Sequence, residues 1–172
     1  TRTGLKLSEY MITEAGFGAD LGAEKFFDIK CRYGGLVPDA AVVVASIRAL
    51  KNHGGVPNEK LLEFNMQGIE IGIANLEKQL ENVKLFGIPV VVALNEFPTD
   101  RKEEIDFVAE RCKELGAEFA LSRVWAAGGE GGIDLAHKVV KAASQPKKFE
   151  LLYENNISIK EKIKIIATKI YG

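Results

Sequence analysis

Two aromatic side chains, Phe97 and Trp125, and one amide, Asn95, follow apolar runs at the points where strands are expected to end. Neither aromatic belongs to an amphipathic pattern that explains its burial. Two rings on neighbouring loops can enclose a flat heteroaromatic ring, with stacking worth about 1–3 kcal/mol per ring. The Asn95 amide offers a donor and an acceptor, which suits the edge of a purine or a pterin. The alternative is that both rings only cover the end of a sheet.

A second group of candidates lies near the beginning of the chain. Glu14 follows Lys6–Thr13, a segment that we predict to be a strand. A carboxylate at a strand end can hold Mg²⁺ or its waters near phosphate groups. Phe17 and Gly18 come next, and the glycines around Phe17 let backbone N–H groups approach an anion at the start of the following helix. The alternatives are a solvated acid and glycines that only make a turn.

The elements that position these residues alternate between strands and helices. Strands are predicted at Lys6–Thr13, Ala40–Ser46, Pro89–Leu94 and Glu118–Val124. Helices are predicted at Leu21–Cys31, Asn58–Leu85, Asp100–Leu115, Ile133–Ala143 and Ser158–Tyr171. This alternation predicts an α/β fold, with right-handed crossovers, a mostly parallel sheet and helices on both faces. With no linker rich enough to divide the chain, residues 1–172 are expected to form a single α/β segment.

Two of the helix predictions depend on local patterns. Asp100 and Glu103 fit a variant capping box, so Asp100 is interpreted first as a helix cap and second as a ligand contact. The longest helix carries one apolar stripe at the helical period, made of Ile69, Ile73, Leu76, Leu80 and Val83.

The candidate loops are expected to converge, because each follows a predicted strand and a parallel sheet brings the carboxyl ends of its strands to one edge. These loops are Glu14–Asp20, Ser46–Gly55, Asn95–Asp100 and Ser122–Gly132. Basic side chains near this edge, such as Arg48 and Lys51, are either phosphate or carboxylate ligands or ordinary solvated surface.

Composition excludes several classes of partner. Lys plus Arg total 23 against 24 for Asp plus Glu, so no long-range field recruits nucleic acid or an anionic membrane. The apolar runs are far too short to span a bilayer. Cys31 and Cys112 lie far apart without a CxxC motif, which argues against a thiolate zinc site and favours a reduced, cytoplasmic protein.

Several blocks of this sequence resemble formate–tetrahydrofolate ligase, also called 10-formyltetrahydrofolate synthetase. The resemblance covers essentially the whole chain and continues through FELLY to the final IKEKIKIIATKIYG. The blocks that carry it are Thr13–Gly35, Val42–Gly55, Gly87–Asp100 and Gly128–Gly132.

The resemblance implies a P-loop-like fold and a reaction in which ATP, formate and tetrahydrofolate give 10-formyltetrahydrofolate, ADP and phosphate through formyl phosphate. It also implies Mg²⁺, activation by a monovalent cation and a homotetramer. Phe97 and Trp125 fall where the family places a ring-stacking pair for the pterin or a purine, with Asn95 beside them as a base reader. Phe17 and Gly18 match the loop near formyl transfer, and Glu14 matches the strand-end acid near Mg²⁺.

One departure from the family pattern concerns phosphate binding. The chain contains no GxxxxGK[ST] sequence, and Gly128–Gly132 lacks the lysine and hydroxyl residue that such a loop needs. The lysine that neutralises phosphate charge is therefore absent from this sequence. We expect the chain to be an internal segment of a larger ligase domain, inactive in isolation and with no catalytic residue assigned. The alternative is a non-catalytic nucleotide- or folate-binding module of the same fold.

Overall fold

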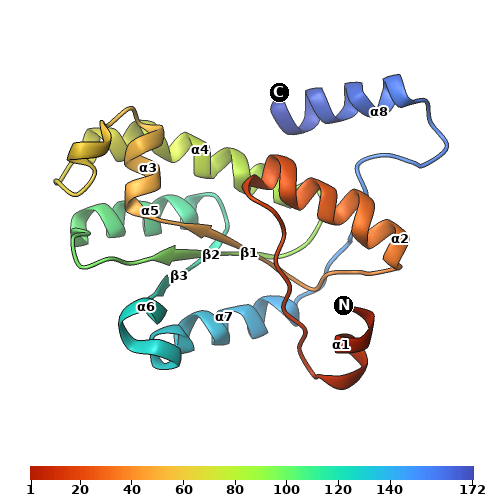
Figure 1. The fold of residues 1–172 in the computed structure, drawn as a ribbon, viewed down its shortest axis with the longest axis horizontal. Coiled ribbons are helices and arrows are strands. Elements are labelled where there is room, and N and C mark those ends of the chain that lie inside the picture. Colours follow the sequence, from red (N-terminus) through yellow and green to blue (C-terminus); the bar gives the residue numbers. More distant parts are fainter.

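A computed structural model describes all of residues 1–172. Its centre is a parallel sheet of three strands in the order β1 (Ala41–Ala45), β2 (Val90–Asn95) and β3 (Glu118–Ser122) (Figure 1). The apolar residues of β2 are buried because the strand is central and covered on both faces. These three strand predictions are confirmed to within a few residues.

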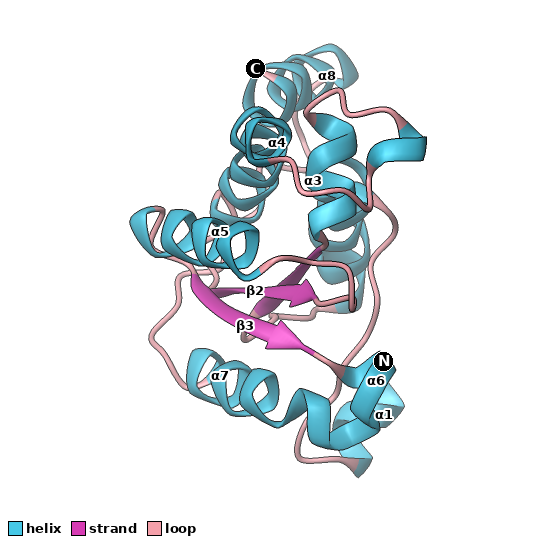
Figure 2. Cartoon of the chain, turned by 90° about the vertical axis from the view of Figure 1, so that its left-hand side faces the viewer, coloured by secondary structure: helices cyan, strands magenta, loops and turns pink.

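Helices cover both faces of the sheet (Figure 2). On one face lie α4 (Met66–Lys84) and α5 (Lys102–Glu114), and on the other lies α7 (Ile133–Ala143). The crossover from β1 to β2 contains α4 and the short α3 (Ile47–His53), and the crossover from β2 to β3 contains α5. The predicted α/β class, with a parallel sheet between helices, is confirmed.

The remaining elements lie outside this central unit. The last helix begins with a capping box, since Ser158 Oγ accepts from Glu161 N at 3.2 Å and a Glu161 carboxylate oxygen accepts from Ser158 N at 2.9 Å. The other elements are α1 (Arg2–Leu7), a helical segment at 18–34 that is largely π-helical and ends in α2 (Arg32–Gly34), short 3-10 turns at Asn58–Lys60 and Gly128–Gly132, α6 (Val124–Ala127), and α8 (Ile159–Ile166) with a final turn Ala167–Tyr171.

The core is a single cluster centred on α4 and β2. Every residue of the predicted apolar stripe on α4 is buried, which confirms the helical period there. Cys112 is fully buried on the inner face of α5, and Cys31 is buried in the segment 18–34. Burial raises the pKa of both thiols to about 11, so they act as core side chains and not as nucleophiles.

Helix α3 packs against α4 at backbone distance. A Cβ atom added to Gly72 would lie 1.8 Å from the carbonyl oxygen of Leu50, so only glycine permits this approach. The contact fixes where α3 lies above the end of β1. It therefore also fixes the backbone positions from which the side chains of Arg48 and Lys51 extend.

The predicted strand Lys6–Thr13 is wrong. The first part of this segment belongs to α1, and the rest is irregular and exposed, with Ile12 86% accessible to solvent. No neighbouring strand pairs with it, so its backbone groups remain solvated. The sheet thus has one strand fewer than expected, and Glu14 does not follow a strand.

The predicted start of the long helix at Asn58 is also wrong, because α4 begins at Met66. The Asn65 side chain caps it by accepting from Gly68 N at 2.8 Å. Residues 58–65 form a loop instead, since other parts of the molecule bind its backbone groups, as described below.

The strand β1 lies at an edge of the sheet and has one open face. Val42 and Val44 are 41% and 63% exposed, while the residues between them pack toward the core. The other edge strand, β3, lies between α5 and α7 (Figure 2). No helix in the structure is both long enough and apolar enough to cross a bilayer.

Candidate functional site

The loops that follow β2 and β3 are bound to each other at the carboxyl edge of the sheet. Asn95 lies opposite Ser122 in the strand register, and Glu96 N–H donates to Ser122 O at 3.0 Å. Arg123 then pairs with Glu96, from Nη2 to Oε1 at 3.3 Å and from Nε to Oε2. A two-point contact of this kind sets the relative orientation of the two loops.

These loops bring the two predicted aromatic residues together. The ring centroids of Phe97 and Trp125 are 6.4 Å apart, with an angle of 43° between the ring planes. A flat ring between them needs about 3.5 Å on each side, or about 7 Å in total. The observed separation is slightly smaller than this, and Trp125 is 76% exposed on the short α6, so few packed neighbours restrain its ring. Asn95 is exposed at the end of β2, on the same edge.

The third loop at this edge supplies a cation to the Phe97 ring. The guanidinium carbon of Arg48, in α3, lies 4.3 Å from the ring centroid, which is a cation–π contact. Helices α3 and α6 lie on opposite sides of the loop that carries Phe97 (Figure 2). Arg48 and Trp125 therefore contact Phe97 from two different helices, α3 and α6.

Asp100 holds the backbone of Phe97 and does not cap α5, so its interpretation as a helix cap is wrong. Asp100 Oδ2 accepts from Phe97 N–H at 2.9 Å, and Asp100 N–H donates to Phe97 O at 2.9 Å. Residues 97–100 form a tight turn, and the Asp100 carboxylate is hydrogen-bonded within that turn. The N-cap is Arg101, whose N–H donates to Glu104 at 3.3 Å. Burial raises the pKa of Asp100, while its hydrogen bond to Phe97 and the charges of Lys51 and Arg48 oppose the shift.

A buried ion pair joins the helices α3 and α5 next to this edge. Lys51 Nζ lies 2.7 Å from Glu104 Oε1, and the side chains are 2% and 0% exposed. Lys51 also donates to Glu63 O at 2.6 Å, and Glu104 accepts from Asn65 N at 2.9 Å. These contacts hold the loop 58–65 against α3 and α5, which explains the late start of α4. The interpretation of Lys51 as solvated surface is wrong, because nothing in its local sequence indicates the acid that buries it.

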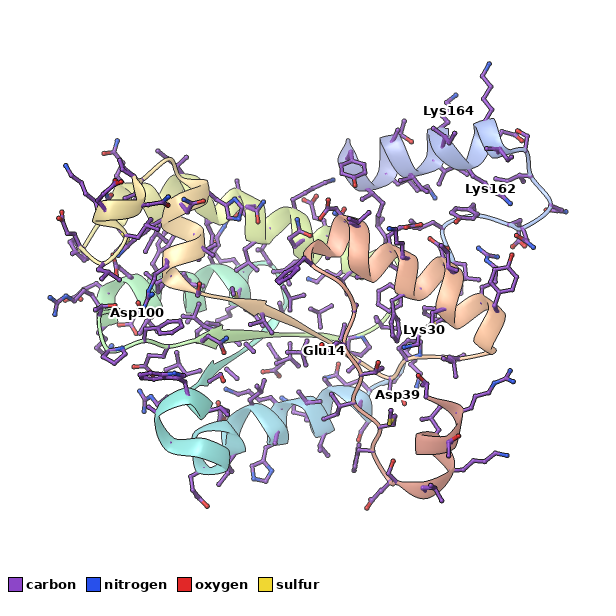
Figure 3. All side chains as sticks on the ribbon, in the orientation of Figure 1. Glu14, Lys30, Asp39, Asp100, Lys162 and Lys164 are labelled. Carbon is purple, nitrogen blue, oxygen red and sulfur yellow. The ribbon has the colours of Figure 1, made fainter.

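The candidates near the N-terminus lie elsewhere. Figure 3 shows Glu14 well away from Asp100, which belongs to the carboxyl edge. Gly18 begins a helix with φ of +71°, and the N–H groups of Ala19 and Asp20 donate to Gln79 Oε1 at 2.7 and 3.1 Å. An amide of α4 thus occupies the N–H groups that the sequence analysis predicts for an anion.

The turn at Phe17 and Gly18 sits beside the last turns of α4, which lead to the amino end of β2. Phe17 itself is fully exposed. Of the four loops expected at one edge, the structure brings three together and leaves this one apart. The physical reason is the missing first strand, since only a strand of the sheet delivers its following loop to the carboxyl edge.

The residues present do not form a magnesium site on their own. Glu14 is exposed, and no cluster of three or more His, Cys, Asp or Glu side chains in the chain is arranged to hold a metal ion. A magnesium ion prefers several oxygen ligands in octahedral geometry, which a single carboxylate does not supply.

The parallel sheet between helices, with polar and aromatic side chains gathered at its carboxyl edge, defines the class: an α/β protein whose loops after parallel strands meet at one edge of the sheet. Comparison with families of known proteins adds the particular assignment. The family described as formate–tetrahydrofolate ligase matches residues 1–172 of this chain. The chain therefore belongs to the formate–tetrahydrofolate ligase family, a family of C–N bond-forming ligases, which confirms the resemblance noted in the sequence.

Proposed function

We propose that this chain supplies the ring-binding loops of a formate–tetrahydrofolate ligase. In this proposal Phe97 and Trp125 hold one flat ring between them, either the pterin of tetrahydrofolate or the purine of ATP. Asn95 hydrogen-bonds to the edge of that ring. The observation that carries the proposal is the aromatic pair itself, 6.4 Å apart and set on loops that an ion pair joins.

The whole reaction that we propose has two steps. A formate oxygen attacks the terminal phosphorus of ATP, so that ADP leaves and formyl phosphate forms. The N10 amine of tetrahydrofolate then attacks the formyl carbon, phosphate leaves, and the amine loses a proton. Ring binding contributes by orienting the amine toward the formyl group, because a fixed geometry replaces a second collision in solution.

Other parts of the proposal depend on the family resemblance more than on this geometry. Phe17 and Gly18 belong to the loop beside formyl transfer, and Glu14 contributes to Mg²⁺ binding with ligands from outside this chain. A monovalent cation, a homotetramer and a cytoplasmic location complete the proposal. The buried and unpaired state of Cys31 and Cys112 agrees with a reducing compartment.

Trp125 is the only tryptophan, so its fluorescence reports ring binding directly. We expect tetrahydrofolate or ADP to quench its emission on titration. Phe97→Ala removes one stacking partner, which corresponds to about 1–3 kcal/mol and weakens binding by roughly fivefold to a hundredfold. The matched control is Tyr33→Ala, an exposed aromatic on α2 that should leave the titration unchanged. Absence of quenching by both probes contradicts the proposal.

The same titration identifies the ring. Quenching by tetrahydrofolate with no effect of ADP assigns the site to the pterin, and the reverse result assigns it to the purine. Competition between the two probes indicates one shared site.

A second candidate function is binding without turnover by this polypeptide alone. It is favoured by the lack of a GxxxxGK[ST] loop in the sequence and of a metal-binding cluster in the structure. We expect this polypeptide to bind the probes but to form no 10-formyltetrahydrofolate from ATP, formate and tetrahydrofolate. Measurable formation of that product by the purified chain overturns this expectation.

A further inference from the structure

Three residues contact Phe97: one is its stacking partner, one binds its backbone, and the third lies over its ring. Trp125 approaches from α6, and Asp100 holds the Phe97 N–H at 2.9 Å. The third residue is Arg48, whose guanidinium carbon lies 4.3 Å from the ring centroid. The close packing of Gly72 on Leu50 keeps α3 in the position from which Arg48 reaches the ring.

Arg48 has no other specific partner in the structure. It forms no ion pair and no hydrogen bond, and its Nε is buried without a partner. Desolvating an arginine N–H without a hydrogen bond is unfavourable, so the position demands an explanation. The contact with the π face of Phe97 supplies it, because the negative face of the ring attracts the cation.

The two faces of the Phe97 ring are thereby made different. The guanidinium comes from α3, and Trp125 comes from α6 on the other side of the loop (Figure 2). Because the guanidinium covers one face of Phe97, a ligand ring has only the opposite face available. A phenyl ring without such a backing cation is free to rotate about χ1 and χ2, and part of its stacking energy is then lost in ordering it.

We propose that Arg48 is a positioning residue for ring binding, which clamps the rear face of Phe97 so that the front face is presented to a ligand beside Trp125. It acts through Phe97 and does not touch the ligand. This inference rests on the proposed function, since it concerns the same aromatic pair.

The first test needs no ligand. Protons on the Arg48 side chain over the ring face should be shifted upfield in the NMR spectrum and show nuclear Overhauser contacts to the Phe97 ring. Phe97→Leu should abolish both signals. Arg48 side-chain shifts typical of a solvated arginine, with no contact to the ring, overturn the proposal whether or not any ligand binds.

The second test measures binding through Trp125 fluorescence, with tetrahydrofolate and ADP as separate probes. Arg48→Met keeps the length of the side chain but removes the cation, and we expect the dissociation constant to rise roughly threefold to tenfold. Arg48→Lys restores a cation without the planar guanidinium, so at least half of the loss on a logarithmic scale should return. The matched control is Lys30→Met, which removes a comparable cation 4.4 Å from the Phe26 ring and should change nothing.

Thermal unfolding of each variant separates positioning from general destabilisation. If Arg48→Met does not fold, Arg48→Gln takes its place in the titration. Equal affinity of the parent and of a folded Arg48→Met or Arg48→Gln chain, in a protein where Phe97→Leu weakens binding, overturns the positioning role alone. If the parent binds neither probe, the proposed function fails, and the ligand-free signals still decide whether Arg48 holds Phe97.

Discussion

The carboxyl edge of the sheet and the helical segment 18–34 both bury charged side chains, but with different partners. At the edge, Lys51 and Glu104 form an ion pair, and the remaining polar atoms bind the backbone of the loop 58–65. In the segment 18–34, Glu24 and Asp28 are 6% and 1% exposed. One oxygen of each has no hydrogen-bond partner. The other oxygen of Asp28 accepts from Leu152 N–H at 2.9 Å and lies 3.4 Å from Arg32 Nη2.

The difference shows what a buried charge does when its partners are complete and when they are incomplete. The paired charges fix three segments of chain around the candidate site, because each must keep its hydrogen bonds in order to remain ionised. The carboxyls of the segment 18–34 have raised pKa values instead. Burial is the main cause for both, and the nearby Asp28 charge raises the pKa of Glu24 further. The buried pair at the carboxyl edge therefore fixes the positions of the surrounding segments. The carboxyls of the segment 18–34 instead make the stability of the fold depend on pH.

The test of this comparison with the largest expected effect removes one charge of the buried pair. Lys51→Met leaves Glu104 buried without its cation, which should lower the free energy of unfolding by about 3–5 kcal/mol in urea denaturation. The control is Lys102→Met, which breaks the exposed pair with Asp106 and should cost less than about 1 kcal/mol. A similar small effect for Lys51→Met would mean that the pair is solvated.

The second test concerns pH. Because the pKa values of Glu24 and Asp28 are raised in the folded state, their stabilising contribution is complete below the ordinary values of about 4 and is lost as the pH rises through the raised values. Glu24→Gln should therefore flatten the decline of the free energy of unfolding from about pH 4 upward. The exposed Glu110→Gln serves as control. Parallel profiles for the parent and Glu24→Gln would contradict the assignment.

The third test separates stability from orientation at the candidate site. Glu96→Gln weakens the partly exposed pair with Arg123, so the free energy of unfolding should change by less than about 1 kcal/mol. The two loops keep their backbone hydrogen bond but lose the charge of their side-chain contact, so ring affinity measured by Trp125 fluorescence should fall roughly twofold to fivefold. Unchanged affinity would show that the strands alone align Phe97 with Trp125.

The smallest effect is expected where the chain buries nothing. Ile12 is 86% exposed in the irregular N-terminal segment. Ile12→Ser should change the free energy of unfolding by no more than about 0.5 kcal/mol, as is usual for surface positions. A loss above about 1 kcal/mol would indicate that this segment packs against the molecule in solution.

The central fold followed from the sequence because its elements carry strong local patterns. The run in β2 is too apolar for a strand with a solvated face, and the stripe on α4 repeats at the helical period. The segment Lys6–Thr13 has a similar composition but no strand to pair with, and pairing is a property of the whole fold. Likewise, the start of α4 depends on Lys51 and Glu104, which lie far from Asn65 in the sequence.

Only part of the candidate site could be predicted from the sequence. The meeting of Phe97 with Trp125 was predictable because a topological rule places loops of parallel strands together. The role of Asp100 was not, since an aspartate suits a helix cap and a tight turn equally well. Arg48 was visible only as a basic residue, because its contact with Phe97 depends on how α3 packs on α4.

The open face of β1 has a practical consequence for anyone who handles this chain in solution. An outer strand with free backbone groups and exposed valines is a template onto which further strands add, and this is a common origin of precipitation. Val44→Lys would place a charge on that face without entering the core, and light scattering at increasing concentration would show a gain in colloidal stability. One face of β1, with Ala41, Val43 and Ala45, packs against the core, whereas its outward face governs how concentrated a solution of the chain remains clear.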